Sequence, residues 1–185
     1  MKRKGGWIQT ATGRAFWPMD PRAEEIDILD VAHGLSNLCR WTGAVREFYS
    51  VAEHSVRVSL ACDPKDALWG LLHDASEAYL SDIARPTKHD PAMKPYRLME
   101  ERVMMEVCKA FALTPYVTPA SVKHADQVLL VTEHRDLMLP SPRNDADLPP
   151  VSALKDHIDE PWTPLLARSA FMARYRQLTS ERRIG

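Results

Sequence analysis

The chain has 185 residues and a formal net charge of −1. This length fits one domain with a core large enough to fold without disulfide bonds. The balanced charge, with no long basic block, argues against binding to long nucleic acid. No stretch approaches the roughly 18 apolar residues of a membrane span, and the N-terminus lacks the apolar run of a signal peptide. Three widely separated cysteines, Cys39, Cys62 and Cys108, predict a reduced, cytoplasmic protein.

The predicted elements are helical except at the start of the chain. Residues 7–17 contain two short apolar runs around a glycine-containing turn, which predicts a small β-hairpin. Apolar residues then recur at helical spacing, and the predicted helices cover 26–39, 51–62, 67 to just before 82, 96–112, 120–137 and 165–178. Asp27 is the expected N-cap of the first helix. Prolines predict a loop over 82–95 and an irregular excursion over 139–164.

Side chains that can bind metals interrupt the apolar faces of three of these predicted helices. His54 lies on the face of Val51, His73 and Asp74 lie within a leucine-rich helix, and Asp126 is one turn before two leucines. A lone histidine on an apolar helix face is more often a hydrogen-bonded core residue than a metal ligand. Asp126, if it lies at the edge of the apolar face of its helix, could instead form an ion pair with a neighbouring basic side chain. Together, however, two histidines and two aspartates form a donor set suited to Mn²⁺, Fe²⁺, Co²⁺, Ni²⁺ or Zn²⁺. The sequence therefore predicts a divalent metal site.

The order of these residues, His54, then His73-Asp74, then Asp126, resembles the H…HD…D pattern of HD-domain phosphohydrolases. Further similarity to the bacterial 5′-deoxynucleotidases lies in A-H-G-L-S at 32–36, R-W at 40–41, S-x-x-E-H-S at 50–55, H-D-A-S-E at 73–77 and D-x-x-x-P-x-K at 82–88. The hairpin W-I-Q-T…G-R-x-F-W-P and the phrase R-x-F-Y-S-V-A-x-H-S at 46–55 are similar to phage-type members, which include dATP triphosphohydrolases.

This resemblance covers residues 7–138 and implies an all-α HD-domain bundle of about six helices, with an N-terminal hairpin. The whole chain, residues 1–185, is expected to form one domain, with the HD core over 26–138. The excursion over 139–164 and the last helix over 165–178 match no motif of the family.

The resemblance also implies roles for the polar residues. His54, His73, Asp74 and Asp126 would hold one divalent ion, and additional Mg²⁺ or Mn²⁺ could bridge the substrate phosphates. Glu77, one helical turn after His73, would act as a general base or orient water, although a solvent-facing glutamate is the alternative at this position. Asp82 would contact the sugar or help to hold a second metal.

The expected substrate-contacting residues are Arg40, Trp41, Pro86, Lys88, Lys123 and His33. Arg40 and Lys88 would neutralise phosphate charge, whereas Lys123 could equally be a solvated lysine. Trp41 offers an apolar plate for the sugar or base, and Pro86 could position its loop against the base edge. His33 is expected to face the site from the first helix.

The resulting functional prediction is hydrolysis of phosphate from a purine dNTP or dNMP, with dATP the best single candidate. A 5′-deoxynucleotidase of broad base specificity that acts only on monophosphates, a phosphodiesterase of the same metal chemistry and a catalytically silent nucleotide-binding HD domain are the alternatives. The complete set of four ligands together with Glu77 favours an enzyme. The resemblance further implies a homo-oligomer, a dimer or higher, in the cytoplasm of a bacterium or a phage-infected host cell.

Overall fold

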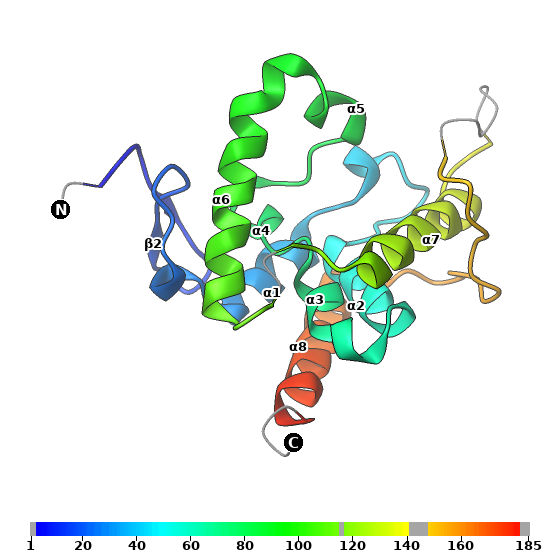
Figure 1. The fold of residues 1–185 in the computed structure, drawn as a ribbon. Helices are drawn as coiled ribbons and strands as arrows, with labels where there is room; N and C mark the ends of the chain where they lie inside the picture. The colour runs from blue at the N-terminus through cyan, green and yellow to red at the C-terminus, as the bar shows by residue number, and fades with distance from the viewer. Residues whose placement is uncertain (1–2, 115–116, 141–147, 182–185) are drawn as a thin grey trace.

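The structure, a computed structural model, describes residues 3–114, 117–140 and 148–181. It is an all-α bundle with a β-hairpin at one side, as predicted (Figure 1). Strands β1 (Ile8–Gln9) and β2 (Ala15–Phe16) pair antiparallel. The helices are α1 (Ile28–Asn37), α2 (Val51–Ala61), α3 (Ala67–Leu72), α4 (Glu77–Leu80), α5 (Arg85–Lys88), α6 (Lys94–Ala110), α7 (Ala120–Leu137) and α8 (Pro164–Glu181). Single 3-10 turns lie at Ala23–Glu25, Trp41–Gly43, Pro64–Asp66 and Pro91–Met93.

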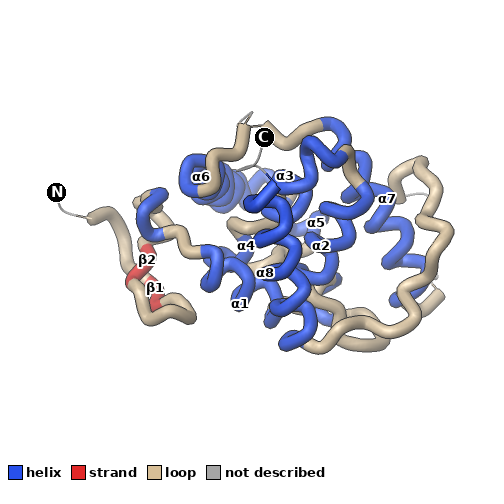
Figure 2. Tube along the Cα trace, turned by 90° about the horizontal axis from the view of Figure 1, so that it is seen from below, coloured by secondary structure: helices blue, strands red, loops and turns tan. Residues whose placement is uncertain are grey.

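Helix α2 lies at the centre of the bundle, where it packs against α1, α3, α7 and α8. Figure 2 shows α8 and α7 on either side of it. The helix begins at the cap residue Ser50, whose hydroxyl oxygen accepts a hydrogen bond from the amide of Glu53. Its side chains Val51 and Val58 are fully buried, and so is His54. Because a buried imidazole is costly without partners, this histidine needs polar neighbours from the surrounding helices.

The predicted helix from residue 67 to just before residue 82 is wrong in its middle, because the chain forms a tight turn between α3 and α4. His73 Nδ1 lies 2.7 Å from the carbonyl oxygen of Gly70 and donates to it. The amides of Ala75 and Glu77 then bond to carbonyls three residues back, at 3.0 and 2.9 Å. Bonds of this spacing tighten the chain relative to an α-helix.

Other boundaries agree with the periodicity more closely. Helix α7 has the predicted bounds, and α8 extends beyond both predicted ends. Asp27 caps α1, since its carboxylate accepts from the amide of Leu29 at 2.9 Å. The predicted loop over 82–95 instead contains α5 and a 3-10 turn, while residues 141–147 of the proline-rich excursion lie outside the described residues.

None of the helices in the described part of the chain is both long and apolar enough to cross a membrane.

The hairpin is fixed to the bundle by an aromatic contact and a buried carboxylate. Phe16 is fully buried, and its ring stacks on that of Tyr79 in α4, with 4.2 Å between the centroids. Asp30 of α1 accepts hydrogen bonds from the amide and the hydroxyl of Thr12 in the hairpin loop, at 2.7 and 2.8 Å. The hairpin therefore helps to position α1 and α4 relative to each other.

The chain after α7 is held by a second buried carboxylate, Asp136, which is 9 % exposed. Its oxygens accept from the Arg135 guanidinium at 2.7 and 2.8 Å, from His157 Nδ1 at 2.8 Å and from the amide of Ile158 at 2.9 Å. Burial alone would raise the pKa of Asp136, but these donors lower it below the usual carboxyl range. The charged form of Asp136 therefore stabilises the folded state.

We expect the substitution Asp136→Asn to lower the free energy of unfolding by roughly 1.5–3 kcal/mol near neutral pH. Because the pKa of Asp136 is lowered on folding, this stabilisation is complete above the unfolded carboxyl pKa of about 3.9 and declines as the pH falls below it. Urea unfolding of the two proteins at several pH values should show a difference that shrinks in acid. The exposed Asp159, changed to Asn, is the matched control. A difference that is constant with pH would contradict the assignment.

Candidate metal centre and active-site cavity

The four predicted metal-binding side chains come together from α2, from the turn after α3 and from α7. Asp74 Oδ2 lies 3.2 Å from His73 Nε2 and 3.7 Å from His54 Nε2. Asp126 Oδ1 lies 3.2 Å from His54 Nε2 and 4.0 Å from His73 Nε2. The donor atoms of His54, His73 and Asp74 all lie within 4.8 Å of one another, so these three residues form a cluster that could hold a metal ion. Asp126 adjoins it.

Both histidines are oriented by a hydrogen bond at the ring nitrogen that faces away from the cluster. Nδ1 of His73 donates to the Gly70 carbonyl, and Nδ1 of His54 lies 2.6 Å from Oε1 of Glu133. Carbonyl and carboxylate oxygens accept, so each Nδ1 carries a proton. In the neutral ring Nε2 then has a free lone pair, and the two Nε2 atoms are 3.3 Å apart. This pattern is typical of metal-binding histidines.

Glu133 is the residue of this site that sequence reasoning missed. It is fully buried on α7 and accepts from His54, from Arg40 Nε at 3.0 Å and from Trp41 Nε1 at 3.2 Å. A signal was available, because Glu133 follows Asp126 by seven residues, which places both on one face of a helix, two turns apart. It ties a predicted metal ligand to two predicted substrate contacts.

The carboxylates of the cluster favour positive charge beside them. Although burial raises the pKa of Asp74 and of Asp126, the neighbouring histidines lower both. Burial and Arg40 act to lower the pKa of His54, yet Glu133 and Asp126 raise it to about 9. Carboxylates that stabilise protonated histidines in this way would also stabilise a divalent cation, which replaces the protons on binding. The residues present therefore fit a metal ion.

Glu77 lies beside the cluster as a buried carboxyl, 5 % exposed. Its Oε1 is 3.4 Å from Nζ of Lys88, which also lies 2.7 Å from Oε1 of Glu100. The other oxygen, Oε2, has no hydrogen-bond partner within the described chain. Burial, followed by the charges of Asp74 and Asp82, raises the pKa of Glu77 well above the usual carboxyl range. A buried carboxyl with a free oxygen can accept a proton from a molecule bound next to it.

A cavity of about 640 Å³ joins the cluster to the predicted substrate contacts. Nine of the predicted residues line it, namely Arg40, Trp41, Asp74, Glu77, Asp82, Pro86, Lys88, Lys123 and Asp126. The sequence did not single out Arg85, His89 and Gln127, which line it as well. Its volume falls within the range of small-molecule sites, roughly 300–1,000 Å³.

Two strained backbone segments shape the edge of this cavity. Ser81, with φ 76°, ends α4 directly before Asp82. Trp41 and Thr42 both have left-handed φ values, 57° and 52°, and the indole of Trp41 is held by its hydrogen bond to Glu133. Such conformations cost free energy and persist where the surroundings determine them, as they do at many functional sites.

The prediction that His33 faces this site is wrong. His33 is exposed on α1, and its Nδ1 lies 3.3 Å from Nη1 of Arg168 in α8. The face of α1 that packs into the bundle carries Val31 and Leu35, both fully buried. His33 is two positions along the chain from each of these residues, so its side chain points to a different side of the helix.

No protein-family model matches the chain. The chain is 35% identical over 177 residues to the Escherichia coli (strain K12) protein YfdR, described as an uncharacterized protein, and the match covers 96% of this chain and 98% of YfdR. It is also 36% identical over 131 residues to an uncharacterized protein of Rhodobacter capsulatus, covering 66% of each chain. The first match is long and similar enough to establish kinship: the chain belongs to the same family as Escherichia coli YfdR.

Proposed function

We propose that this protein is an HD-type phosphohydrolase that uses a divalent transition metal to remove phosphate from deoxynucleotides. The observation that carries the proposal is a single cavity that reaches the metal-binding cluster at Asp74 and Asp126 and is also lined by a buried carboxyl with a free oxygen and several cationic side chains. The resemblance to the H…HD…D pattern gives this combination its reaction class.

The metal would be held by His54, His73, Asp74 and Asp126, and Mn²⁺, Fe²⁺, Co²⁺, Ni²⁺ and Zn²⁺ all suit this mixture of nitrogen and oxygen donors. When bound, it would supply Lewis acidity that polarises a phosphoryl oxygen and makes water more acidic. Glu133 keeps His54 in the orientation that points Nε2 at the cluster.

Glu77 is the proposed proton acceptor. As the oxygen of the attacking water forms its bond to phosphorus, Oε2 takes a proton of that water. The bond from phosphorus to the leaving oxygen breaks, and the leaving oxygen keeps the electron pair of that bond and takes a proton from solvent. A carboxyl whose pKa is raised is a stronger base than an ordinary one when it is ionised. The free Oε2 is available for this role because no other described residue occupies it.

Substrate phosphates would be neutralised by cations on the cavity wall, which are Arg40, Arg85, Lys88 and Lys123. Arg40 and Lys88 are already paired with Glu133 and Glu100, whereas Arg85 and Lys123 form no ion pair among the described residues. The two additional cations suit a polyphosphate better than a monophosphate, since each further phosphate adds negative charge. Trp41 offers a flat apolar surface for a base, and Gln127 adds an amide that can donate to and accept from base edges. We therefore favour a purine dNTP, with dATP as the first candidate.

The test is a panel of dNMPs and dNTPs assayed with Mn²⁺ or Co²⁺, with phosphate, pyrophosphate and triphosphate measured separately. We expect turnover of a purine dNTP by the unmodified chain and none by Asp74→Asn, while the control Asp159→Asn retains full activity. Cleavage of monophosphates alone would identify a 5′-deoxynucleotidase. If no member of the panel is hydrolysed with either metal, the enzyme proposal fails and a nucleotide-binding domain without catalysis remains.

A further inference from the structure

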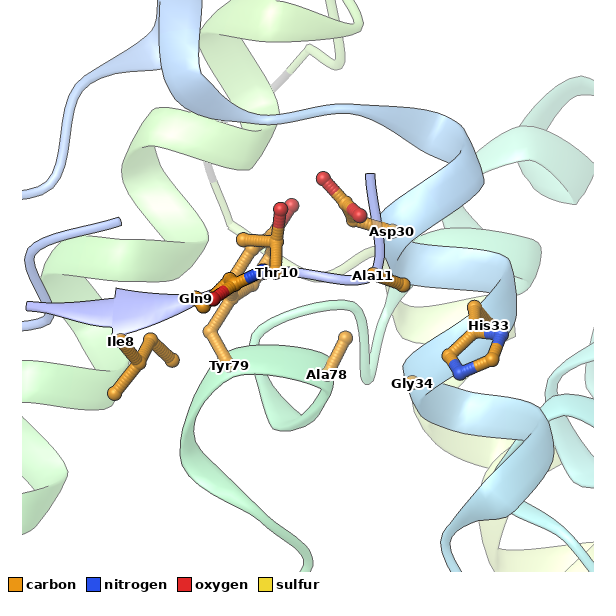
Figure 3. Close-up of a pocket in the computed structure, with 9 residues that line it drawn as sticks. All are labelled: Ile8, Gln9, Thr10, Ala11, Asp30, His33, Gly34, Ala78 and Tyr79. Atoms are coloured by element: carbon orange, nitrogen blue, oxygen red, sulfur yellow. The ribbon is translucent and has the colours of Figure 1, made fainter. Parts of the chain in front are cut away.

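Two further cavities lie beside the hairpin and α1, one of them against α4 and the other against α8. One, of about 470 Å³, is lined by the start of the hairpin, by Asp30 and by Tyr79, and Figure 3 shows these side chains with His33 of α1. The other, of about 450 Å³, lies between the hairpin loop and α8. The two have Ala11 and His33 in common, so they adjoin. Neither contains any residue that lines the metal cavity, so they form a separate site.

The second of these cavities is lined by two arginines of α8. Arg168 and Arg176 are exposed and two helical turns apart, and Met172 lies between them on the same face. Within the described residues, neither forms an ion pair with a carboxylate. Arg174, by contrast, points elsewhere and donates to the hydroxyl and the carbonyl of Ser59. The two cavity arginines thus carry positive charge that no carboxylate of the described residues neutralises.

His33 adds a third donor to this wall. Its Nδ1 lies 3.3 Å from Nη1 of Arg168, and because a guanidinium can only donate, Nδ1 accepts. The neutral ring then carries its proton on Nε2, which makes that nitrogen a donor. The hydroxyls of Thr12 and Ser169 are committed to Asp30 and to a backbone carbonyl. The side-chain donors left free in this cavity are therefore the two guanidiniums, which are charged, and the imidazole N–H.

The remaining lining is apolar, with Leu29, Ala32 and Met172 beside the charged groups. Asp30, whose oxygens accept from Thr12, lines the neighbouring cavity and not this one. A site with cationic donors next to an apolar surface favours a ligand that has an anionic group and a flat or apolar part. Guanidinium groups match the geometry of phosphate oxygens particularly well.

We propose that the cavity lined by His33, Arg168 and Arg176 is a second binding site, which takes a phosphorylated small molecule such as a nucleotide. Its phosphoryl oxygens contact the two guanidiniums and the imidazole N–H, and its remaining part lies against Leu29 and Met172. The site is independent of the metal centre and of the reaction proposed for it.

Two methionines allow the two sites to be observed separately. Met172 lines the proposed site and Met138 lines the metal cavity. In the full chain, labelled with ¹³C-methyl methionine and kept metal-free with a chelator, dAMP and pyrophosphate are titrated in separate experiments. The two resonances are assigned with Met172→Leu and Met138→Leu. We expect the Met172 methyl signal to shift and to reach saturation as the ligand is added. The dissociation constant fitted to this shift should be the same whether or not the Met138 signal also moves.

Arg168→Ala and Arg176→Ala should each weaken this binding by tenfold or more, because each removes a charged donor. Arg102→Ala removes the same charge from an exposed position on α6 and should leave the binding unchanged. Tighter binding of dAMP than of pyrophosphate supports a nucleotide ligand, and equal binding supports recognition of the phosphoryl group itself. A Met172 signal that does not saturate, or an equal loss in Arg102→Ala, overturns the proposal. None of these readouts requires hydrolysis.

Discussion

Replacing Glu133 with alanine should lower the free energy of unfolding by about 3–5 kcal/mol, the usual cost of removing one partner from a buried ion pair. The carboxylate is fully buried and receives hydrogen bonds from His54, Arg40 and Trp41. Its pKa is lowered, because the charges of Arg40 and His54 outweigh the effect of burial, which raises it. Without Glu133, the largely buried guanidinium of Arg40 loses its nearer ion-pair partner, at 3.0 Å, and retains Asp74 at 3.7 Å.

The same substitution should weaken binding of a divalent metal by roughly 10–100-fold, since His54 loses the bond that orients its ring. Chemical unfolding measures the first effect, and titration with Co²⁺, followed by its visible absorption, measures the second. Glu133→Gln keeps the volume of the side chain and should show smaller losses of both kinds, which gives a second variant if the alanine protein does not fold. Glu101→Ala, at an exposed position on α6, is the control. Equal stability of Glu133→Ala and this control would refute the role of Glu133.

The long helices could be predicted from sequence because their apolar spacing is regular, and α7 begins and ends where that spacing does. The interruption of the helix after α3 could not be predicted from sequence. It depends on the hydrogen bond that His73 donates to the Gly70 carbonyl, and the spacing of apolar residues carries no information about such a bond. The short helix α5 was missed for a related reason. A helix of four residues is too short to show a period.

The metal cluster was predictable because metal-binding side chains lie on otherwise apolar helix faces, a contradiction that a cation resolves. Glu133 obeyed the same rule seven residues after Asp126, but it was overlooked because the family motif ends at the aspartate. The error at His33 has the opposite origin. Its role was taken from the resemblance, whereas the buried positions Val31 and Leu35 assign the inner face of α1 to other residues. Residue patterns on each helix were thus a better guide here than the motif alone.

Glu77 and Asp126 should have separable effects on activity if the proposed reaction is correct. Glu77→Ala is expected to lower kcat by about 10²–10⁴-fold, the usual contribution of a general base, while Co²⁺ binding is retained. Asp126→Ala should lose both metal affinity and turnover, because Asp126 Oδ1 lies 3.2 Å from His54 Nε2 at the cluster. The measurements are steady-state kinetics with the best substrate of the panel and Co²⁺ titration of each variant.

The two substitutions should differ because Glu77 is not a proposed metal ligand, and burying its carboxylate lowers the stability of the folded protein. Burial and the charges of Asp74 and Asp82 disfavour its ionised form, so its removal should leave stability unchanged or raise it, as is common for catalytic groups. Glu77→Gln, which cannot accept a proton but keeps the shape of the side chain, should be as inactive as Glu77→Ala. Full turnover in either variant, alongside an inactive Asp126→Ala, would retain the metal centre and require a proton acceptor other than Glu77. Asp82 would then be the candidate, because it is the other carboxyl of the described cavity wall that is not assigned to the metal.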